Sequence, residues 1–561
     1  MDSSTLGLKL QNQRIGALCY ADDVVLLAES RVQLDLLIQK LEDFLSASKL
    51  SVNHSKCCSL SVKLRNGKRI VNDPSIPQVS IQGSPIPYLV DFYKYLGTMS
   101  NLQSFKSLPK PFDTFKENLA KLSHSPLFHF QKLEMLKIYL LPTLDYAMKN
   151  QCLRVEELKA LDRAILANVR SWFKFPNSIN NHLLYTPTSL GGLGLRNLRN
   201  DYASLRLSSA LNLVQSQDER IQKIARSVLS EIVDRRTKST MSPLEYLHRD
   251  KEVGPIRDVR SLLSSIRLNR KHLNVNLLLK DDDQTSIDLD IPTLQCPPNI
   301  PTFRAQQVSR IKRLRWHSQN KSFEAWRALL DQGRSVDCFS SLKESNSWLR
   351  TGQIAIQTYR FAVMGRVNVL PTKCVLKRRQ LSPNTHCRRC PCDIESIGHV
   401  LNGCPHSTNL FRVRHDLVLD MLSKAIKPKK DWTLRINQTT PYVPSNRRPD
   451  LVLVNDKEKK IVIADITICY ENNSDRLDQV RDHKVQKYST EAGYLQDLGY
   501  EVHCTALVYG SLGSHHSLNK DIYSMIHTKP SQRTRKALLK KITVSVLESS
   551  NKIWRNHVRD S

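Results

Sequence analysis

Residues 447–488 read RRPDLVLVNDKEKKIVIADITICYENNSDRLDQVRDHKVQKY and contain two apolar, β-branched runs, Asp450–Val454 and Ile461–Cys469. A polar segment with turn-forming residues separates the runs, a pattern that predicts a β-hairpin. Antiparallel pairing around that turn places Asp450 roughly opposite Asp465. Two carboxylates that face each other repel unless a cation lies between them, and Mg²⁺ prefers carboxylate oxygens. Because a charge inside an apolar run is costly unless it is paired or metal-bound, the hairpin predicts a Mg²⁺ site.

A helix is expected after the hairpin, because residues at helical spacing share one face: Leu477, Val480, Lys484, Lys487 and Tyr488. This face can bring Lys484 back over the two carboxylates, with Lys487 as its rival. A metal polarises phosphate and activates water, and a nearby lysine stabilises the charge that develops in the transition state. A further strand at Glu501–Val508 is predicted to complete a small sheet.

Around Pro449-Asp450 the stretch resembles the PD-(D/E)xK nuclease superfamily, which has a restriction-like α/β fold. The usual lysine lies two residues after the second acid, where this chain has Thr467. A lysine moved to the helix resembles the endonuclease of site-specific, type-2 non-LTR retrotransposons. The resemblance implies Mg²⁺-dependent DNA cleavage by Asp450 and Asp465, with Arg448 beside a phosphate. The alternative is an ordinary half-buried hairpin with surface acids and lysines.

The 561-residue chain is long enough for several domains, and its formal net charge is +31. Such a charge predicts a polyanionic partner, most simply nucleic acid. Most of the 13 cysteines are scattered, which is typical of a reducing compartment. We find neither a signal-peptide pattern nor an apolar run of about 20 residues, so no membrane partner is expected. With DNA as its substrate, the protein is expected in the nucleus.

Near the N-terminus, Gly16–Ser30 reads GALCYADDVVLLAES, with apolar residues on both sides of Tyr20-Ala21-Asp22-Asp23. The pattern predicts a strand, a tight turn and a strand that present Asp22 and Asp23 as Mg²⁺ ligands. The box resembles the palm motif of reverse transcriptases, and an amphipathic helix is expected at Val32–Ser48. That family needs a third aspartate and a fingers domain. The 19 residues before Tyr20 cannot hold them, so we expect no polymerase activity from this chain alone.

The resemblance continues along the chain. Lys56 is similar to the lysine that follows the palm helix, and Phe92–Gly97 (FYKYLG) to the primer-grip hairpin. A thumb-like pair of helices is expected at Gln131–Met148, which Pro142 should end or kink, and at Val155–Phe173. The GGLGL loop that follows the second helix completes this similarity.

Asp201–Leu247 is predicted to be helical, and the acidic 280–290 and Pro-rich Cys296–Thr302 segments mark a boundary. A basic segment, Phe303–Lys321, comes next. Its arginines around an aromatic side chain are typical of nucleic-acid binding. The candidates are Arg310, Arg313, Arg315 and Trp316. A solvated helix face is the alternative.

Cys387, Cys390, His399 and Cys404 have the spacing C-x2-C-x8-H-x4-C. Three thiolates and one imidazole satisfy tetrahedral Zn²⁺, and a closed set of four ligands indicates a structural site. Cys392, His386 and His406 are rival ligands that fit the spacing less well. The order of ligands resembles the CCHC zinc knuckle that precedes the endonuclease in the same retrotransposons.

These motifs follow the order of that family, so the chain is identified as the C-terminal part of a non-LTR retrotransposon polyprotein. The predicted α+β multidomain organisation is a partial palm at 1–100, a helical thumb at 101–200, a helical linker at 201–380, a zinc knuckle at 381–416, a restriction-like endonuclease at 417–515 and a basic tail at 516–561. The tail is either a helix packed on the nuclease or a DNA-contacting segment. The resemblance implies target-primed reverse transcription with target DNA and element RNA as partners, and the alternative is a catalytically inactive nucleic-acid-binding remnant.

Overall fold

The computed structural model describes residues 6–559, apart from positions 11–12, 67, 74–75, 91–92, 97, 101–109, 152, 238–240, 249–260, 280–286, 292–308, 429 and 520–531. The chain forms two compact units. The first comprises residues 1–118, 140–161 and 198–315, and the second comprises residues 119–139, 162–197 and 316–561. Each unit is assembled from separate stretches of chain and does not coincide with any one of the six consecutive domains expected from the sequence. The bounds of those six domains remain a prediction. No helix in the described part of the chain is long and apolar enough to cross a membrane.

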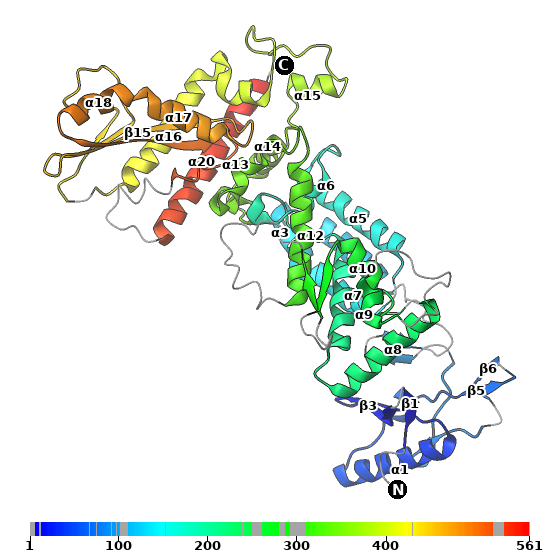
Figure 1. Ribbon diagram of the computed structural model, residues 1–561. Coiled ribbons are helices and arrows are strands. Elements are labelled where there is room, and N and C mark those ends of the chain that lie inside the picture. The colour runs from blue at the N-terminus through cyan, green and yellow to red at the C-terminus, as the bar shows by residue number, and fades with distance from the viewer. Residues whose placement is uncertain are drawn as a thin grey trace. The chain divides into compact units, whose positions relative to one another are not determined.

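The N-terminal part of the first unit consists of short antiparallel hairpins and one long helix (Figure 1). The predicted acid hairpin is confirmed as β3 (Ala17–Tyr20) and β4 (Asp23–Leu26), with Tyr20 paired to Asp23. The predicted helix is confirmed as α1 (Arg31–Ser48), which Ser30 caps by accepting a hydrogen bond from the Gln33 amide. The remaining elements are β1 (Leu8–Leu10), β2 (Gln13–Ile15), η2 (His54–Lys56), β5 (Val62–Arg65), β6 (Lys68–Val71), β7 (Ser80–Ile81), β8 (Ser84–Pro85), β9 (Tyr93–Tyr95) and β10 (Thr98–Ser100). β9 and β10 form a hairpin at the predicted primer-grip motif, of which Phe92 and Gly97 lie outside the described residues.

The rest of the first unit is mainly helical. One of its cores joins Leu207, Leu211, Leu229, Tyr246 and Leu314. The elements are η4 (Leu141–Leu144), α4 (Asp145–Asn150), α7 (Leu198–Val214), α8 (Glu219–Thr237), α9 (Pro243–His248), α10 (Ile266–Leu273), β11 (Asn276–Leu279) and β12 (Ile287–Asp290). Helices α2 (Lys110–His124), α5 (Val155–Phe173) and α12 (Arg310–Arg327) each contribute residues to both units. The predicted boundary at Cys296–Thr302 lies outside the described residues.

Pro142 has the predicted effect on the apolar region around it. The α-helical stretch α3 (His129–Met135) passes through the wider turn η3 (Leu136–Leu140) into the tight turn η4, whose first positions hold Pro142. Proline lacks an amide hydrogen and cannot continue the hydrogen-bonding pattern of the preceding helix. The second predicted helix is confirmed as α5 with the expected bounds, Val155–Phe173.

The second unit contains a four-stranded sheet in the order β13-β14-β15-β16, formed by Thr433–Ile436, Leu451–Asn455, Lys460–Cys469 and Glu501–Gly510. β13, β14 and β15 are antiparallel neighbours, and β16 lies parallel to β15. A parallel pair needs a crossover connection. Helices α17 (Arg476–Lys487) and α18 (Ser489–Asp497) supply it. The predicted hairpin, helix and third strand are therefore confirmed.

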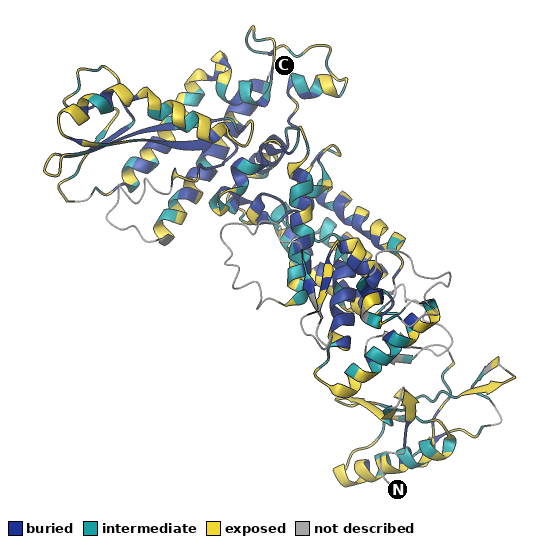
Figure 2. Cartoon of the chain, in the orientation of Figure 1, coloured by how far each residue is buried: buried dark blue, intermediate teal, exposed yellow. Residues whose placement is uncertain are grey.

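Both faces of this sheet are covered, which explains the nearly continuous apolar sequence of β14 and β15. Successive side chains of a strand point to opposite faces. Leu451 and Leu453 accordingly pack with helices α16 (Thr408–Ala425) and α20 (Gln532–Val558), whereas Val452 and Val454 pack with Tyr488 and Leu495 beyond α17. Figure 2 shows most of β15 in the colour of buried residues.

Helices and turns make up the remainder of the second unit. They are α6 (Asn181–Tyr185), η5 (Thr188–Leu190), α13 (Val336–Ser340), η6 (Lys343–Arg350), α14 (Ile356–Arg366), α15 (Lys373–Arg378), η7 (His399–Gly403) and η8 (Pro405–Ser407). Of the two alternatives for the C-terminal segment, the structure shows the packed helix. Leu539, Ile542 and Val546 of α20 lie in the core beneath the sheet.

Candidate acid site and metal centre

Asp450 and Asp465 meet at one end of the β14–β15 pair. Leu451 is paired with Ala464, so the register places the preceding Asp450 across from Asp465, as predicted. Both acids have the same strand parity as Val452 and Ile463, and they therefore face the α17–α18 side of the sheet. Asp465 is only 3% exposed. Its charge lies inside the sheet and needs partners there.

Helix α17 and Tyr488, the residue that follows it, supply those partners. Lys484 Nζ lies 2.7 Å from Asp465 Oδ2, and the Tyr488 hydroxyl donates a 3.0 Å hydrogen bond to Asp465 Oδ1. Lys487 Nζ instead donates to the Tyr488 hydroxyl at 3.0 Å. The structure thus distinguishes the two predicted lysines: Lys484 contacts a carboxylate directly, and Lys487 lies one hydrogen bond further away. Burial and the nearby Asp465 charge raise the pKa of Tyr488, which keeps its hydroxyl a donor.

His415 was not among the predicted site residues, yet it contacts the second carboxylate. Its Nε2 lies 3.3 Å from Asp450 Oδ2 and 3.2 Å from the Ile466 carbonyl oxygen, and its Nδ1 lies 3.1 Å from Asp416 Oδ1. The hydrogen bond to Asp450 raises the pKa of His415 to about 9 although burial opposes the charge. Burial raises the pKa of Asp450, but hydrogen bonds from His415 and the Ile466 amide outweigh it and lower that pKa below its usual value.

The acids line an open cavity of about 320 Å³ together with basic side chains. Arg448 is exposed and contributes to this cavity, as do Lys484 and Lys487. The site therefore combines two carboxylates, which can ligate a divalent cation, with three cations able to contact phosphate oxygens. The roles predicted for these residues remain predictions.

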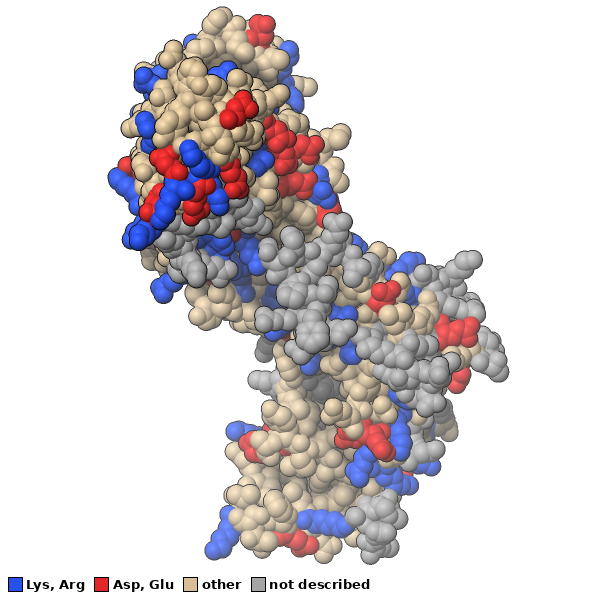
Figure 3. All heavy atoms as spheres, turned by 60° about the vertical axis from the view of Figure 1, so that its left-hand side comes forward, with Lys and Arg blue, Asp and Glu red and all other residues tan. Residues whose placement is uncertain are grey.

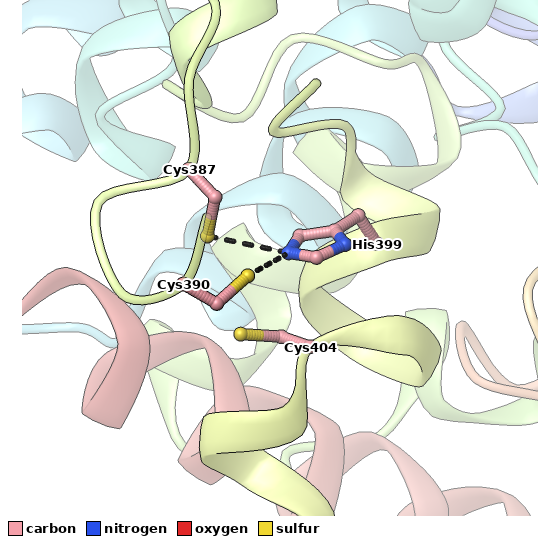
Figure 4. A group of neighbouring side chains, drawn as sticks. All are labelled: Cys387, Cys390, His399 and Cys404. Carbon is pink, nitrogen blue, oxygen red and sulfur yellow. Dashed lines mark hydrogen bonds between the residues drawn. The ribbon is translucent and has the colours of Figure 1, made fainter. Parts of the chain in front are cut away.

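Cys387, Cys390, His399 and Cys404 converge on one point (Figure 4). Their donor atoms all lie within 4.8 Å of one another. His399 Nε2 is 3.2 Å from Cys387 Sγ and 3.3 Å from Cys390 Sγ. Ordinary zinc bond lengths and a tetrahedral angle separate such atoms by about 3.6 Å, so the donor set fits Zn²⁺.

The three rival ligands do not take part in this cluster. Cys392 Sγ is directed to the Ile394 carbonyl oxygen at 3.6 Å, and His386 pairs with the exposed Asp393 at 3.4 Å. His406 lies outside both groups that the described residues offer to a metal ion. The second of these groups consists of Cys387, Glu395 and His557. Sequence spacing gave no indication of it, because His557 lies on the last helix.

In the first unit, the acid hairpin presents Asp22 and Asp23 to solvent. The two-residue turn between β3 and β4 contains Ala21 with a φ of 52°. This left-handed conformation matches the twist of a two-residue hairpin. Lys56 lies in the short helical turn η2. The metal-binding role of the two aspartates remains a prediction.

The predicted nucleic-acid contacts of α12 have intramolecular partners in the structure. Arg315 pairs with Asp201 at 2.5 Å and with Asp145 at 2.9 Å, and Arg310 Nη1 donates to Asn212 Oδ1 at 2.6 Å. Arg313 Nη2 donates to the Leu289 carbonyl oxygen at 3.1 Å. These bonds tie the start of α12 to its own unit. Binding of nucleic acid by these arginines and by Trp316 remains a prediction, and the two ion pairs of Arg315 compete with it.

Comparison with known proteins agrees with the motifs. Residues 4–99 match the family "Reverse transcriptase (RNA-dependent DNA polymerase)". The chain is 30% identical over 212 residues to the Pol polyprotein of the type-2 retrotransposable element R2DM of Drosophila melanogaster, covering 37% of this chain and 20% of that protein. It is 25% identical over 514 residues to a Pol polyprotein of a type-1 retrotransposable element R2 of Popillia japonica, covering 88% and 89%. A Nasonia vitripennis R2 polyprotein is 21% identical over 490 residues, covering 86% and 40%.

The chain thus spans a small part of the Drosophila and Nasonia polyproteins and most of the Popillia one. These similarities extend well beyond the segment that matches the reverse transcriptase family. The chain therefore belongs to the non-LTR retrotransposon polyproteins that contain a reverse transcriptase.

Proposed function

We propose that the second unit is a Mg²⁺-dependent endonuclease of the restriction-like class, which nicks DNA. The observation that carries the proposal is the meeting of Asp450 and Asp465 across a hairpin, with Lys484 Nζ 2.7 Å from one carboxylate. The order of the sheet and its flanking helices supports the proposal, because a crossover helix holds the lysine over the acids. Lys484 on this helix thus takes the place of the lysine that the superfamily usually has on the strand, at the position of Thr467.

In this proposal Asp450 and Asp465 hold Mg²⁺, which when bound polarises a phosphate and lowers the pKa of a water molecule. Tyr488 orients the Asp465 carboxylate through its 3.0 Å hydrogen bond. Lys484 leaves this carboxylate for the phosphate as negative charge develops there. Arg448, exposed at the edge of the same cavity, binds a neighbouring phosphate and fixes the register of the strand.

The Cys387, Cys390, His399 and Cys404 cluster holds a structural Zn²⁺ in this account. Four protein ligands complete a tetrahedral shell and leave no position for substrate. Binding free energy of such a site is on the order of 10 kcal/mol and serves largely to fold the surrounding loops.

For the whole polyprotein we propose a part in target-primed reverse transcription in the nucleus, in which a nicked target DNA primes copying of element RNA. Asp22 and Asp23 would supply two Mg²⁺ ligands of the polymerase site. The net charge of +31 favours these polyanionic partners. Figure 3 shows acidic groups lying among the lysines and arginines on the face that it presents.

A second candidate is an inactive nucleic-acid-binding remnant, and one observation favours it. His415 and Lys484 already pair with Asp450 and Asp465, so a cation must displace or share these partners. The two candidates differ in what the acids do. In a nuclease they are needed for cleavage and not for binding, whereas a remnant binds DNA and never cleaves it.

Nicking of supercoiled plasmid in Mg²⁺ by the full chain, alongside Asp465→Asn, tests the proposal. Asp482→Asn is a matched control, because this acid lies on α17 with its side chain 76% exposed. We expect the parent and the control to nick, and Asp465→Asn to bind DNA without nicking. Absence of nicking by the parent, with salt-sensitive DNA binding intact, would support the remnant.

A further inference from the structure

We infer that Glu395 and His557 form an outer shell around the Cys/His metal centre, and that through them the bound metal fixes the C-terminal end of helix α20. This inference rests on the proposed zinc site and adds two residues to it. Neither residue belongs to the set of four ligands recognised by spacing.

The first observation is a buried polar network beside Cys387. His557 Nε2 lies 3.1 Å from Glu395 Oε2 and 3.7 Å from Cys387 Sγ. The side chains of His557 and Glu395 are both 0% exposed. A proton on Nε2 is therefore placed between a carboxylate and a ligand sulfur. Hydrogen bonds of this kind from second-layer residues orient metal ligands and adjust their basicity.

Glu395 has further partners and is held firmly. Arg388 Nη2 donates to its Oε1 at 2.9 Å, the Arg388 amide donates to Oε2 at 3.0 Å, and the Lys373 amide donates to Oε1 at 2.9 Å. A carboxylate that accepts so many hydrogen bonds is better satisfied here than as a metal ligand. We therefore assign Glu395 a positioning role, in which it orients His557 towards Cys387.

The second observation is independent of this network. Arg389, within the loop between the first two cysteines, donates from Nε to the His557 carbonyl oxygen at 3.0 Å and from Nη2 to the Asn556 carbonyl oxygen at 3.4 Å. The final carbonyls of a helix have no partner within the helix, and a cation there also favours the helix dipole. The metal-binding loop thus caps α20, while Ile542 and Val546 of the same helix pack beneath the sheet.

The test compares zinc affinity of the full chain with that of Glu395→Gln, His557→Ala and His557→Gln, by competition with a chromophoric chelator. His386→Gln is the matched control, because the ring of this exposed histidine, next to Cys387 in the chain, pairs with the exposed Asp393. We expect a loss of about 10- to 100-fold in affinity for Glu395→Gln and His557→Ala. His557→Gln, whose amide can still donate to Glu395, should recover part of it.

Cobalt substitution separates a positioning role from a general loss of folding. All four ligands remain in Glu395→Gln, so its Co²⁺ spectrum should stay tetrahedral while the sulfur-to-cobalt band shifts. If the buried variants fail to fold, chelation of the parent decides: hydrogen exchange should quicken in the last turns of α20. Zinc affinity equal to the parent's together with an unshifted cobalt band in Glu395→Gln would overturn the inference and leave the proposed zinc site intact. Hydrogen exchange in α20 that chelation does not change would have the same meaning. A parent chain that binds no zinc would overturn the metal site itself.

Discussion

The two lysines of α17 give the sharpest prediction, because the structure assigns them different partners. Lys484→Met removes the cation 2.7 Å from Asp465 and leaves that carboxylate with Tyr488 as its side-chain donor. Removing one member of a buried ion pair costs about 3–5 kcal/mol. The Lys484 side chain is 26% exposed, so solvent screening reduces the expected loss of stability to about 1–2 kcal/mol.

The effect on catalysis should be larger than the effect on folding. If Lys484 stabilises the transition state, its removal should lower the nicking rate by about 10²- to 10³-fold. Lys487→Met is the matched comparison, because it removes a contact to Tyr488 only, and we expect a loss of less than about tenfold, on the scale of one modest hydrogen bond.

Single-turnover nicking in saturating Mg²⁺, together with urea denaturation in the absence of Mg²⁺, measures both quantities. A second set of urea curves with Mg²⁺ should show a smaller stability difference between Lys484→Met and the parent, because a bound cation compensates the negative charge of Asp465. A loss of activity in Lys487→Met equal to that in Lys484→Met, or nicking by Lys484→Met at the parental rate, would contradict the assignment of Lys484 as the catalytic lysine.

Four further predictions follow from the same contacts. His415→Gln should cost about 2 kcal/mol of stability at pH 6 and little at pH 10. The pKa of His415 is raised to about 9, so its stabilising effect is complete below about pH 6.5 and is lost as the pH rises through 9. Urea denaturation of this variant and the parent at both pH values measures the difference. Tyr488→Phe should cost about 1–2 kcal/mol by removing a donor to the buried Asp465, and an equal melting temperature would contradict it. Ile542→Ala should cost about 2–4 kcal/mol, since α20 lies in the sheet core, whereas a solvated tail would give no change in denaturation. Cys404→Ser should abolish stoichiometric zinc in metal analysis of the purified chain, and full retention would exclude Cys404 as a ligand.

Local patterns predicted the parts of the site that are close in sequence. Two apolar runs marked the strands β14 and β15, and the position of the turn between them sufficed to place Asp450 across from Asp465. Helical spacing alone placed Lys484 and Tyr488 on the face that returns over the acids. The cysteine spacing likewise brought together the four members of the metal cluster.

Contacts between distant segments could not be predicted in this way. His415 precedes Asp450 by 35 residues and lies on a helix that covers the opposite face of the sheet, so no local period connects them. The partners of Arg315 are 114 and 170 residues away, so no local pattern could show that this arginine is paired within its own unit. His557 meets Glu395 across 162 residues of chain, and only the folded core of α20 brings it there.

A count of bound Mn²⁺ by electron paramagnetic resonance tests whether Asp450 and Asp465 together bind a divalent cation. The parent, Asp450→Asn and the exposed control Asp482→Asn would be titrated as full chains with the zinc site loaded. We expect Asp450→Asn to bind one Mn²⁺ fewer than the parent and the control to match the parent. Equal stoichiometry and affinity in all three proteins would contradict the claim and leave the acids as structural partners of His415 and Lys484.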